Sequence, residues 1–317
     1  MPESAVFFSG EFIARNTALR HDAAALAQAW ADATTRFLPV WEAQPLIRDG
    51  RAARLSRAEL GQRLPPLTGA IYLGMETGGH LFAIALEERE APRGVGEFGG
   101  LRDLVNRVSA ADAGLLAYAR AMVNWHRHHR HCGVCGAATQ AAEGGFVLAC
   151  SSAGCGHRSF PRLDPAIIVL VHRDQHCLLG RQPSWPTDRF STIAGFAEPG
   201  EALEDAVRRE VMEETDVRIT QCCYRASQPW PFPASLMIGF HAMATSSDIR
   251  LNDGELAEAR WFSREELAAG AVVLPPRASV AWRLIEDWFD AVPGPGLAQL
   301  HRDGEFLRRP DQPPEAR

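Results

Sequence analysis

Residues 195–217 read GFAEPGEALEDAVRREVMEETDV, and this stretch decides the fold of the C-terminal half. A glycine turn at Gly195 leads into a helix with three closely spaced carboxylates. At about 100° per residue, Glu210, Glu213 and Glu214 fall within about a third of the helix circumference. The apolar residues on the same side are Leu203, Ala206, Val207 and Val211. The negative charge of carboxylates in an apolar sector must be neutralised, and a bound cation does this. Ligands that are all oxygen favour Mg²⁺ or Mn²⁺.

The opposite side of this helix carries charges that we expect to be solvated. They are Glu201, Glu204, Asp205, Arg208 and Arg209. We expect Arg209 to face away from the metals and to pin the glycine loop or a glutamate through a bidentate pair. The alternative is a charged amphipathic helix whose glutamates pair with arginines. The glycine lead-in, the Arg-Glu pair and the apolar placement favour metal binding.

Composition places the chain among globular proteins with two or three domains. The 317 residues include no lysine and carry a net charge of −6, which argues against a dedicated nucleic-acid-binding protein. No apolar run approaches the ~20 residues that cross a bilayer, and residues 1–10 lack the pattern of a signal peptide. We therefore expect a cytoplasmic protein.

Four of the seven cysteines form two close pairs, Cys132-x2-Cys135 and Cys150-x4-Cys155. Each pair can turn tightly enough to give two thiolates to one tetrahedral zinc ion. Four thiolates close the coordination shell, so we expect one structural zinc per chain. One alternative is four free thiols, and another replaces one cysteine by His157; the paired spacing and the complete cysteine set disfavour both.

Residues 227–235 read SQPWPFPAS, with prolines at three alternate positions. Proline fixes φ and removes a backbone donor, so the segment should be extended and outside the centre of a sheet. A stiff backbone would hold Trp230 and Phe232 ready to stack on planar rings, and Gln228 could pair with a base or amide edge. A proline-rich loop with buried aromatic side chains explains the local pattern equally well.

Periodicity predicts the remaining elements. Strands are expected at 6–8, 80–86, 166–171, near 224 and at 235–243, and helices at 22–33, 112–125 and 280–289. From Pro293 onward the chain is rich in Pro, Gly and Arg, which predicts a loose tail.

Together these motifs resemble one known family. Residues 195–217 are similar to the Nudix box, the signature of hydrolases that cleave diphosphates linked to another group, with Asp216 where the box has Gly. That position ends the helix in a left-handed conformation, which Asp tolerates. The SQPWPFPAS segment and the four-cysteine ribbon, entered through Trp125-His126, resemble the NADH pyrophosphatase family, also called NudC-type.

The resemblance implies an α/β chain of several parts. Residues 1–125 would form an N-terminal α+β domain of the NADH pyrophosphatase type, and residues 126–162 the zinc ribbon. Residues 163–292 would form a Nudix hydrolase domain, an α/β/α sandwich with a mixed sheet. Residues 293–317 would be the loose tail.

The resemblance also implies metal-dependent hydrolysis of the diphosphate of NADH or NAD⁺ to nicotinamide mononucleotide and AMP by a homodimer. The implied catalytic residues are Glu210, Glu213 and Glu214. The implied ligands of Mg²⁺ or Mn²⁺ are Ala194 through its backbone oxygen, Glu210, Glu214 and Glu255. The implied substrate-binding residues are Phe160, Phe196, Ser227, Gln228, Pro229, Trp230, Pro231, Phe232, Pro233, Ala234, Ser235 and Ala281.

Three other functions stay open at this point. The same chemistry would remove NAD caps from RNA 5′ ends, because free and capped NAD present the same diphosphate. A nucleotide-sensing module without turnover is disfavoured by the intact acidic helix. A zinc-ribbon nucleic-acid module is disfavoured by the net negative charge.

Overall fold

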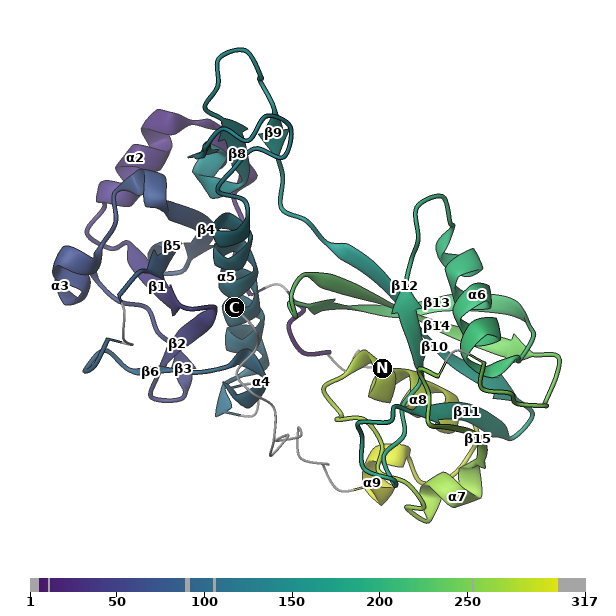
Figure 1. The fold of residues 1–317 in the computed structure, drawn as a ribbon. Helices are drawn as coiled ribbons and strands as arrows, with labels where there is room; N and C mark the ends of the chain where they lie inside the picture. The colour runs from purple at the N-terminus through teal and green to yellow at the C-terminus, as the bar shows by residue number, and fades with distance from the viewer. Residues whose placement is uncertain (1–5, 11, 89–91, 105–106, 253, 302–317) are drawn as a thin grey trace. The chain divides into compact units, whose positions relative to one another are not determined.

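The computed structural model describes residues 6–10, 12–88, 92–104, 107–252 and 254–301, and its elements are labelled in Figure 1. The chain divides into two compact units. The N-terminal unit comprises Phe8–Leu163 together with Trp230–Ala234. The C-terminal unit comprises Met1–Phe7, Asp164–Pro229 and Ser235–Arg317. Each unit is described by itself.

The N-terminal unit is built on a mixed sheet with the order β3-β2-β1-β5-β4, with β6 paired to β2. In its core the Tyr72 ring packs edge-on against Phe82 and the Phe37 ring packs against Phe82 at a tilt, with fully buried aliphatic side chains around them. Its strands are β1 (Arg36–Trp41), β2 (Gln44–Arg48), β3 (Arg51–Ala52), β4 (Ala70–Glu76), β5 (Gly79–Leu86) and β6 (Glu97–Phe98). Its helices are α1 (Thr17–His21), α2 (Ala23–Ala31), α3 (Arg57–Leu60), α4 (Leu101–Leu104), α5 (Ala110–His128) and the 3-10 turns Gly61–Arg63 and Leu67–Gly69.

Strand β1 is central although Pro39 lies in its middle. Phe37 donates its N–H to Leu55 on one side of β1, and the N of residue 39 points to that same side because backbone groups alternate along a strand. The ladder from β1 to β2 begins only at Val40, opposite Pro45. The missing donor of Pro39 therefore falls outside this ladder, which is how proline is tolerated in a central strand.

The cysteine ribbon belongs to the N-terminal unit and has three antiparallel strands. They are β7 (Thr139–Ala142), β8 (Val147–Cys150) and β9 (Arg158–Ser159), with a 3-10 turn at Glu143–Gly145. This turn packs on β4: a Cβ at Gly145 would lie 3.0 Å from Cγ1 of Ile71. The guanidinium of Arg20 also covers the ring of Phe146 at 3.4 Å. The ribbon is thus held to the N-terminal sheet by side-chain packing as well as by chain connection.

The C-terminal unit is a sandwich around strand β10 (Asp164–Arg173). Alternate residues of β10 enter two different cores, as the period of a strand requires. Ile167 and Val169 pack with apolar residues of α6 (Leu203–Thr215), whereas Ile168 and Leu170 pack with α8 (Val280–Phe289). The predicted α/β/α sandwich is confirmed.

The sheet of this unit has the order β13-β14-β10-β11-β15, and β12 also pairs with β10. Strands β10 and β14 are parallel and the pairs β10–β11, β10–β12 and β11–β15 are antiparallel, so the sheet is mixed as predicted. The other elements are β11 (His176–Arg181), β12 (Ile193–Phe196), β13 (Ile219–Trp230), β14 (Ser235–Ala244), β15 (Glu258–Ser263), α7 (Arg264–Ala268) and α9 (Leu297–Leu300).

Two expectations at the chain ends are wrong within the described residues. Residues 6–8 form no strand; Phe7 and Phe8 lie in a turn. The predicted loose tail begins with the short helix α9, where Leu297 is fully buried and Arg277 donates a hydrogen bond to the carbonyl of Ala298 at 2.6 Å. Residues 302–317 of the predicted tail lie outside the described part of the chain. No helix among the described residues has the length and apolar character needed to cross a membrane.

His241 on β14 gives the C-terminal unit a defined pH response. Its buried ring joins β14 to α8 through a 2.8 Å hydrogen bond between Nε2 and the Leu284 carbonyl, and burial lowers its pKa from 6.5 to about 4. The unfolded chain therefore binds a proton between these values that the folded chain does not. The contribution of His241 to the free energy of unfolding should be constant above pH 6.5. It should fall as the pH drops toward 4, by at most about 1.4 kcal/mol per pH unit.

His241→Gln keeps a donor for the Leu284 carbonyl and removes the titrating group. As the pH is lowered from 7 to 5, the free energy of unfolding of the variant should therefore rise relative to that of the unaltered chain. Urea unfolding at both pH values measures this difference. His176→Gln is the control, because His176 is exposed. A His241→Gln chain with the pH dependence of the unaltered chain would contradict the prediction.

Candidate active site

Helix α6 carries two buried carboxylates one turn apart. Glu210 is 9% exposed and Glu214 is 3% exposed, whereas the side chain of Glu213 is 54% exposed. The helix ends at Asp216, which is left-handed with φ 59° and donates its N–H to the Met212 carbonyl at 2.9 Å. The predicted left-handed helix end is therefore present with Asp in place of Gly.

Gly195 is not a turn residue, contrary to the sequence-based prediction. It lies in β12 and pairs with Ile167 of β10, while the left-handed glycine of this loop is Gly200 with φ 96°. A Cβ at Gly195 would lie 1.9 Å from the carboxyl carbon of Glu210. Glycine is required here for space, because any side chain would displace the Glu210 carboxylate.

Arg209 ties the loop, the strand end and the helix together. Its Nε and Nη2 donate to the two carboxylate oxygens of Glu201 at 2.7 and 3.0 Å, and its Nη2 also donates to the Phe196 carbonyl at 2.8 Å. Its Nη1 donates to Glu210 at 2.9 Å and to Glu213 at 3.1 Å. The predicted bidentate clamp is present, and its carboxylate is Glu201, which the helical projection had placed on the solvated side. The expectation that Arg209 faces away from the metal-binding glutamates is wrong, because Nη1 contacts Glu210 and Glu213.

Charge and burial at Glu210 suit a bound cation. Burial raises the pKa of Glu210, Arg209 partly offsets this, and the charges of Glu213 and Glu255 raise it further. Glu255 thus lies within electrostatic range of Glu210. A hard divalent ion prefers carboxylate oxygens and would supply the positive charge that keeps this buried group ionised. The buried carboxylates Glu210 and Glu214 fit such an ion as donors, Glu255 contributes a further negative charge near Glu210, and Ala194 is exposed on β12.

The four ribbon cysteines form a compact ligand set. Their sulfur atoms all lie within 4.8 Å of one another, and no other group of three or more His, Cys, Asp or Glu ligand atoms is this close in the part of the chain that the structure describes. The Sγ atoms of Cys132 and Cys155 are 3.8 Å apart and those of Cys135 and Cys150 are 3.4 Å apart. Zinc at about 2.3 Å from each thiolate sets tetrahedral sulfurs roughly 3.8 Å apart, so the set fits zinc.

Backbone donors support the thiolate state in this cluster. The N–H of Val134 donates to Cys132 Sγ at 3.4 Å and lowers the pKa of this thiol to about 6. The N–H of Ser152 donates to Cys150 Sγ at the same distance, but burial and the neighbouring thiols raise the pKa of Cys150, so a bound cation is needed for all four cysteines to be thiolates. His157 is not part of the set; its ring contacts Ser159 Oγ at 3.3 Å.

The aromatic-proline segment is extended only in its first half. Ser227–Trp230 ends the edge strand β13, and residues 231–234 form the turn into β14. Gln228 is buried, and its amide is bonded to backbone of the same unit: Nε2 donates to the carbonyls of Phe7 and Ala278 at 3.2 and 3.1 Å, and Oε1 accepts from Val280 N at 2.9 Å. These bonds favour a structural role for Gln228 over the predicted contact with a base edge.

The other predicted substrate-binding residues fall into different environments. Phe160 in the N-terminal unit and Phe196 in the C-terminal unit are 64% and 58% exposed, as suits a ring that binds a ligand. Ala281 is instead buried in the α8 core. Trp230 and Phe232 belong to the N-terminal unit, where their rings contact each other edge-on with centroids 5.1 Å apart.

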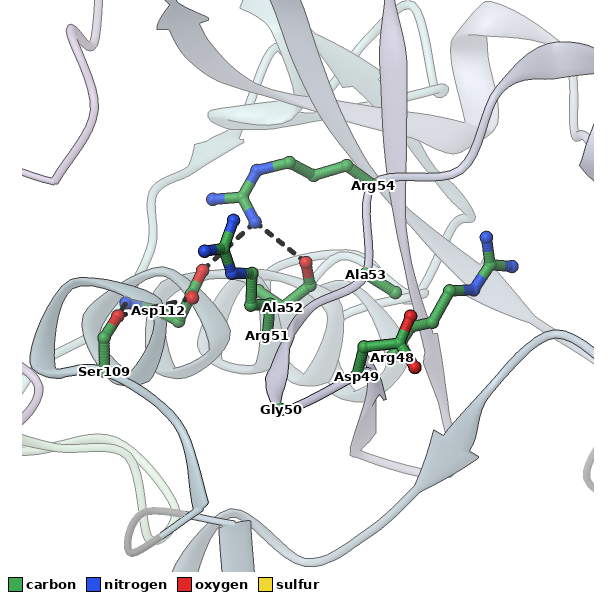
Figure 2. Close-up of a pocket in the computed structure, with 9 residues that line it drawn as sticks. All are labelled: Arg48, Asp49, Gly50, Arg51, Ala52, Ala53, Arg54, Ser109 and Asp112. Atoms are coloured by element: carbon green, nitrogen blue, oxygen red, sulfur yellow. Dashed lines mark hydrogen bonds and ion pairs between the residues drawn. The ribbon is translucent and has the colours of Figure 1, made fainter.

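A separate hollow of about 660 Å³ lies in the N-terminal unit and holds none of the predicted site residues (Figure 2). Arg54 lies beside Asp112, which accepts from its Nη1 at 3.1 Å, and Arg54 also forms a bidentate pair with Glu76. Arg48 is paired with Glu59 at 2.6 Å. The residues that line it are Arg48, Asp49, Gly50, Arg51, Ala52, Ala53, Arg54, Ser109 and Asp112. Arg48 and Arg54 of this hollow are thus each paired with carboxylates.

Three family models match the chain in the order that the motifs predicted. The NADH pyrophosphatase-like rudimentary NUDIX domain matches residues 34–125, the NADH pyrophosphatase zinc ribbon domain matches residues 127–160, and the NUDIX domain matches residues 162–287.

Sequence relatives point to the same family as these three models. The NAD-capped RNA hydrolase NudC of Mycobacterium bovis is 37% identical over 287 residues, which are 85% of this chain and 90% of that protein. The NAD-capped RNA hydrolase NUDT12 of Homo sapiens is 43% identical over 192 residues, but the match spans only 42% of its length. A crystal structure of a NUDIX hydrolase from Nitrosomonas europaea is similar over 51% of this chain and 90% of that chain, with 18% identity and a TM-score of 0.40. On the sequence matches, the chain belongs to the NudC-type NADH pyrophosphatase family of Nudix hydrolases.

Proposed function

We propose that this protein hydrolyses the diphosphate of NADH or NAD⁺ to nicotinamide mononucleotide and AMP, with Mg²⁺ or Mn²⁺ as catalytic metal. The observation that carries the proposal is the pair of buried carboxylates Glu210 and Glu214, one of them seated against Gly195 and clamped by Arg209. Buried carboxylates are costly without a partner charge, and a diphosphate hydrolase uses them to gather divalent ions.

Each residue then has a defined task. Glu210 and Glu214 would hold the metal, with Glu255 and the Ala194 carbonyl as further ligands. Divalent ions in such a site neutralise the diphosphate and lower the pKa of bound water. Glu213, which is exposed, or a neighbouring box glutamate orients or deprotonates the attacking water. Attack at one phosphorus expels the other mononucleotide, and Arg209 keeps Glu210 in place throughout.

The remaining proposals concern the substrate and its setting. Trp230, Phe232, Phe160 and Phe196 offer rings to the bases of the dinucleotide. Removal of NAD caps from RNA is the second candidate, favoured by the names of the relatives, and it needs no change in this chemistry. A homodimer in the cytoplasm and the domain boundaries at residues 125, 162 and 292 stay predictions.

The products test the proposed reaction class. Purified protein with Mg²⁺ or Mn²⁺ should convert NADH to nicotinamide mononucleotide and AMP, and in ¹⁸O water the label should appear on a phosphate of one of them. NAD-capped RNA and ADP-ribose, offered in parallel, rank the substrates. Free nicotinamide and ADP-ribose as first products would overturn the proposal, because hydrolysis at a glycosidic bond requires a different pair of carboxylates.

Glu214→Gln preserves the shape of α6 and removes one buried charge. Turnover should fall by roughly 10²–10⁴-fold, because charge that stabilises a transition state is lost, while the melting temperature changes little. Glu204→Gln is the matched control, since Glu204 lies on the same helix and is exposed. Near-normal turnover by folded Glu214→Gln protein would refute the assignment.

The ribbon should contain one zinc ion per chain that resists mild chelation. Cys132→Ser should lose this zinc and lower the free energy of unfolding substantially, because metal-binding energy at such a site is folding energy. Metal analysis and thermal unfolding measure both effects, and Cys223→Ser, at an exposed cysteine outside the ribbon, should change neither. Zinc-free protein that melts at the temperature of the loaded protein would show that the cysteines are not a structural zinc site.

A further inference from the structure

The SQPWPFPAS segment is divided between the two units of the chain. Its first three residues, Ser227–Pro229, belong to the C-terminal unit, where Gln228 is bonded to the backbone at Ala278 and Val280. Its next five residues, Trp230–Ala234, cluster with the N-terminal unit. The aromatic part of the segment is therefore held by contacts with residues more than a hundred positions earlier in the sequence.

Arg120 of helix α5 makes the polar contacts that hold the turn at residues 231–234. It is 5% exposed, its Nε donates to the Ala43 carbonyl at 3.0 Å, and its Nη1 donates to the Pro231 carbonyl. The guanidinium also lies 5.0 Å from the centroid of the Phe232 ring. One side chain thus fixes both the backbone and a ring of the turn.

Aromatic contacts complete the support of the turn. The buried ring of Phe8 meets Trp230 and Phe232 edge-on, with both centroids 6.2 Å away. Arg102 of α4 lies 4.3 Å from the centroid of Phe232. These rings are therefore packed by the N-terminal unit before any ligand arrives, which reduces the entropy that binding would cost.

Arginine suits this position for a chemical reason. Pro229, Pro231 and Pro233 have no N–H, so this stretch has few donors with which to fix itself in a sheet. Its carbonyl oxygens remain as acceptors, and a planar guanidinium can donate to two carbonyls in fixed directions while its face lies on an aromatic ring. Lysine offers a point charge on a flexible stem and cannot reproduce that geometry.

We propose that Arg120 is a positioning residue through which the N-terminal unit sets the conformation of Trp230 and Phe232, and with it the preference for diphosphates that carry stacking rings. This inference rests on the proposed function for its catalytic consequence. The structural part, that Arg120 orders residues 230–234, stands independently of catalysis.

Arg120→Met and Arg120→Lys test the inference against Arg127→Met, a change at an exposed arginine of the same helix. The substrates are NADH and a diphosphate that joins two ribose 5-phosphates without bases. For Arg120→Met the KM for NADH should rise about tenfold to a hundredfold, the range that loss of base stacking produces, with a smaller change in kcat. Cleavage of the substrate without bases should stay within about twofold of normal, and Arg120→Lys should not restore NADH affinity.

Hydrogen exchange of the free protein gives a readout that does not depend on turnover. The amide of Phe232 is bonded to the Trp230 carbonyl at 2.8 Å, so loss of Arg120 should speed exchange at Phe232 and Ala234 several-fold while the rest of α5 stays protected. Phe8→Leu removes the ring that contacts Trp230 and Phe232 and should loosen the same turn. This variant replaces Arg120→Met in the experiment if Arg120→Met does not fold.

The outcomes separate this inference from the proposed function. Faster exchange at residues 232 and 234 together with a selective rise in the KM for NADH would support it. Unchanged exchange, or equal losses on both substrates with a lower melting temperature, would overturn it. If the unaltered protein cleaves neither substrate, the proposed function fails, while the exchange measurement still decides whether Arg120 orders the turn.

Discussion

The Arg209 guanidinium is the interaction on which the acidic site depends. It holds three separate pieces of the C-terminal unit: the loop at Glu201, the end of β12 at Phe196 and the helix at Glu210. The hydrogen bonds from Arg209 and from the N–H of Glu198 lower the pKa of Glu201 to about 2, so this carboxylate is ionised at neutral pH. Arg209 Nη1 contacts Oε1 of Glu210 at 2.9 Å, and this contact helps to fix the buried glutamate in place.

The position of that glutamate is set in turn by strand pairing. Gly195 is opposite Ile167, and Ile167 faces the core under α6. The apolar face of α6 packs on β10 and so brings Glu210 over β12, where only a residue without a Cβ leaves room for a carboxylate. The hydrophobic core thus positions the metal-binding groups, while the hydrogen bonds of Arg209 orient them.

The sequence predicted those features that local spacing determines. The apolar placement of Glu210 and Glu214 on α6, the clamp role of Arg209, the cysteine set and the limits of α8 were predicted from the sequence, and the structure confirms them. Glu213, predicted on the same side, is exposed instead. The part played by Gly195 could not be predicted in this way, since it depends on a contact between a strand and a helix 15 positions later. Strand β1 was missed because Pro39 argues against a central strand unless the start of the neighbouring ladder is known. Leu297 was assigned to a loose tail because composition carries no information about where a chain end packs.

The division of the aromatic-proline segment shows the same limit most clearly. Read locally, three prolines predict a stiff extended piece, and stiffness alone was enough to suggest rings held ready for a ligand. The structure has an edge strand followed by a turn, and the order of that turn comes from Arg120 and Phe8 in addition to the prolines. Prolines restrict the backbone but leave carbonyl groups without donors nearby, so distant side chains must supply the remaining contacts. The contacts of Arg120 and Phe8 with this turn lie within the N-terminal unit, so this unit, and not the three prolines alone, sets the arrangement of the Trp230 and Phe232 rings.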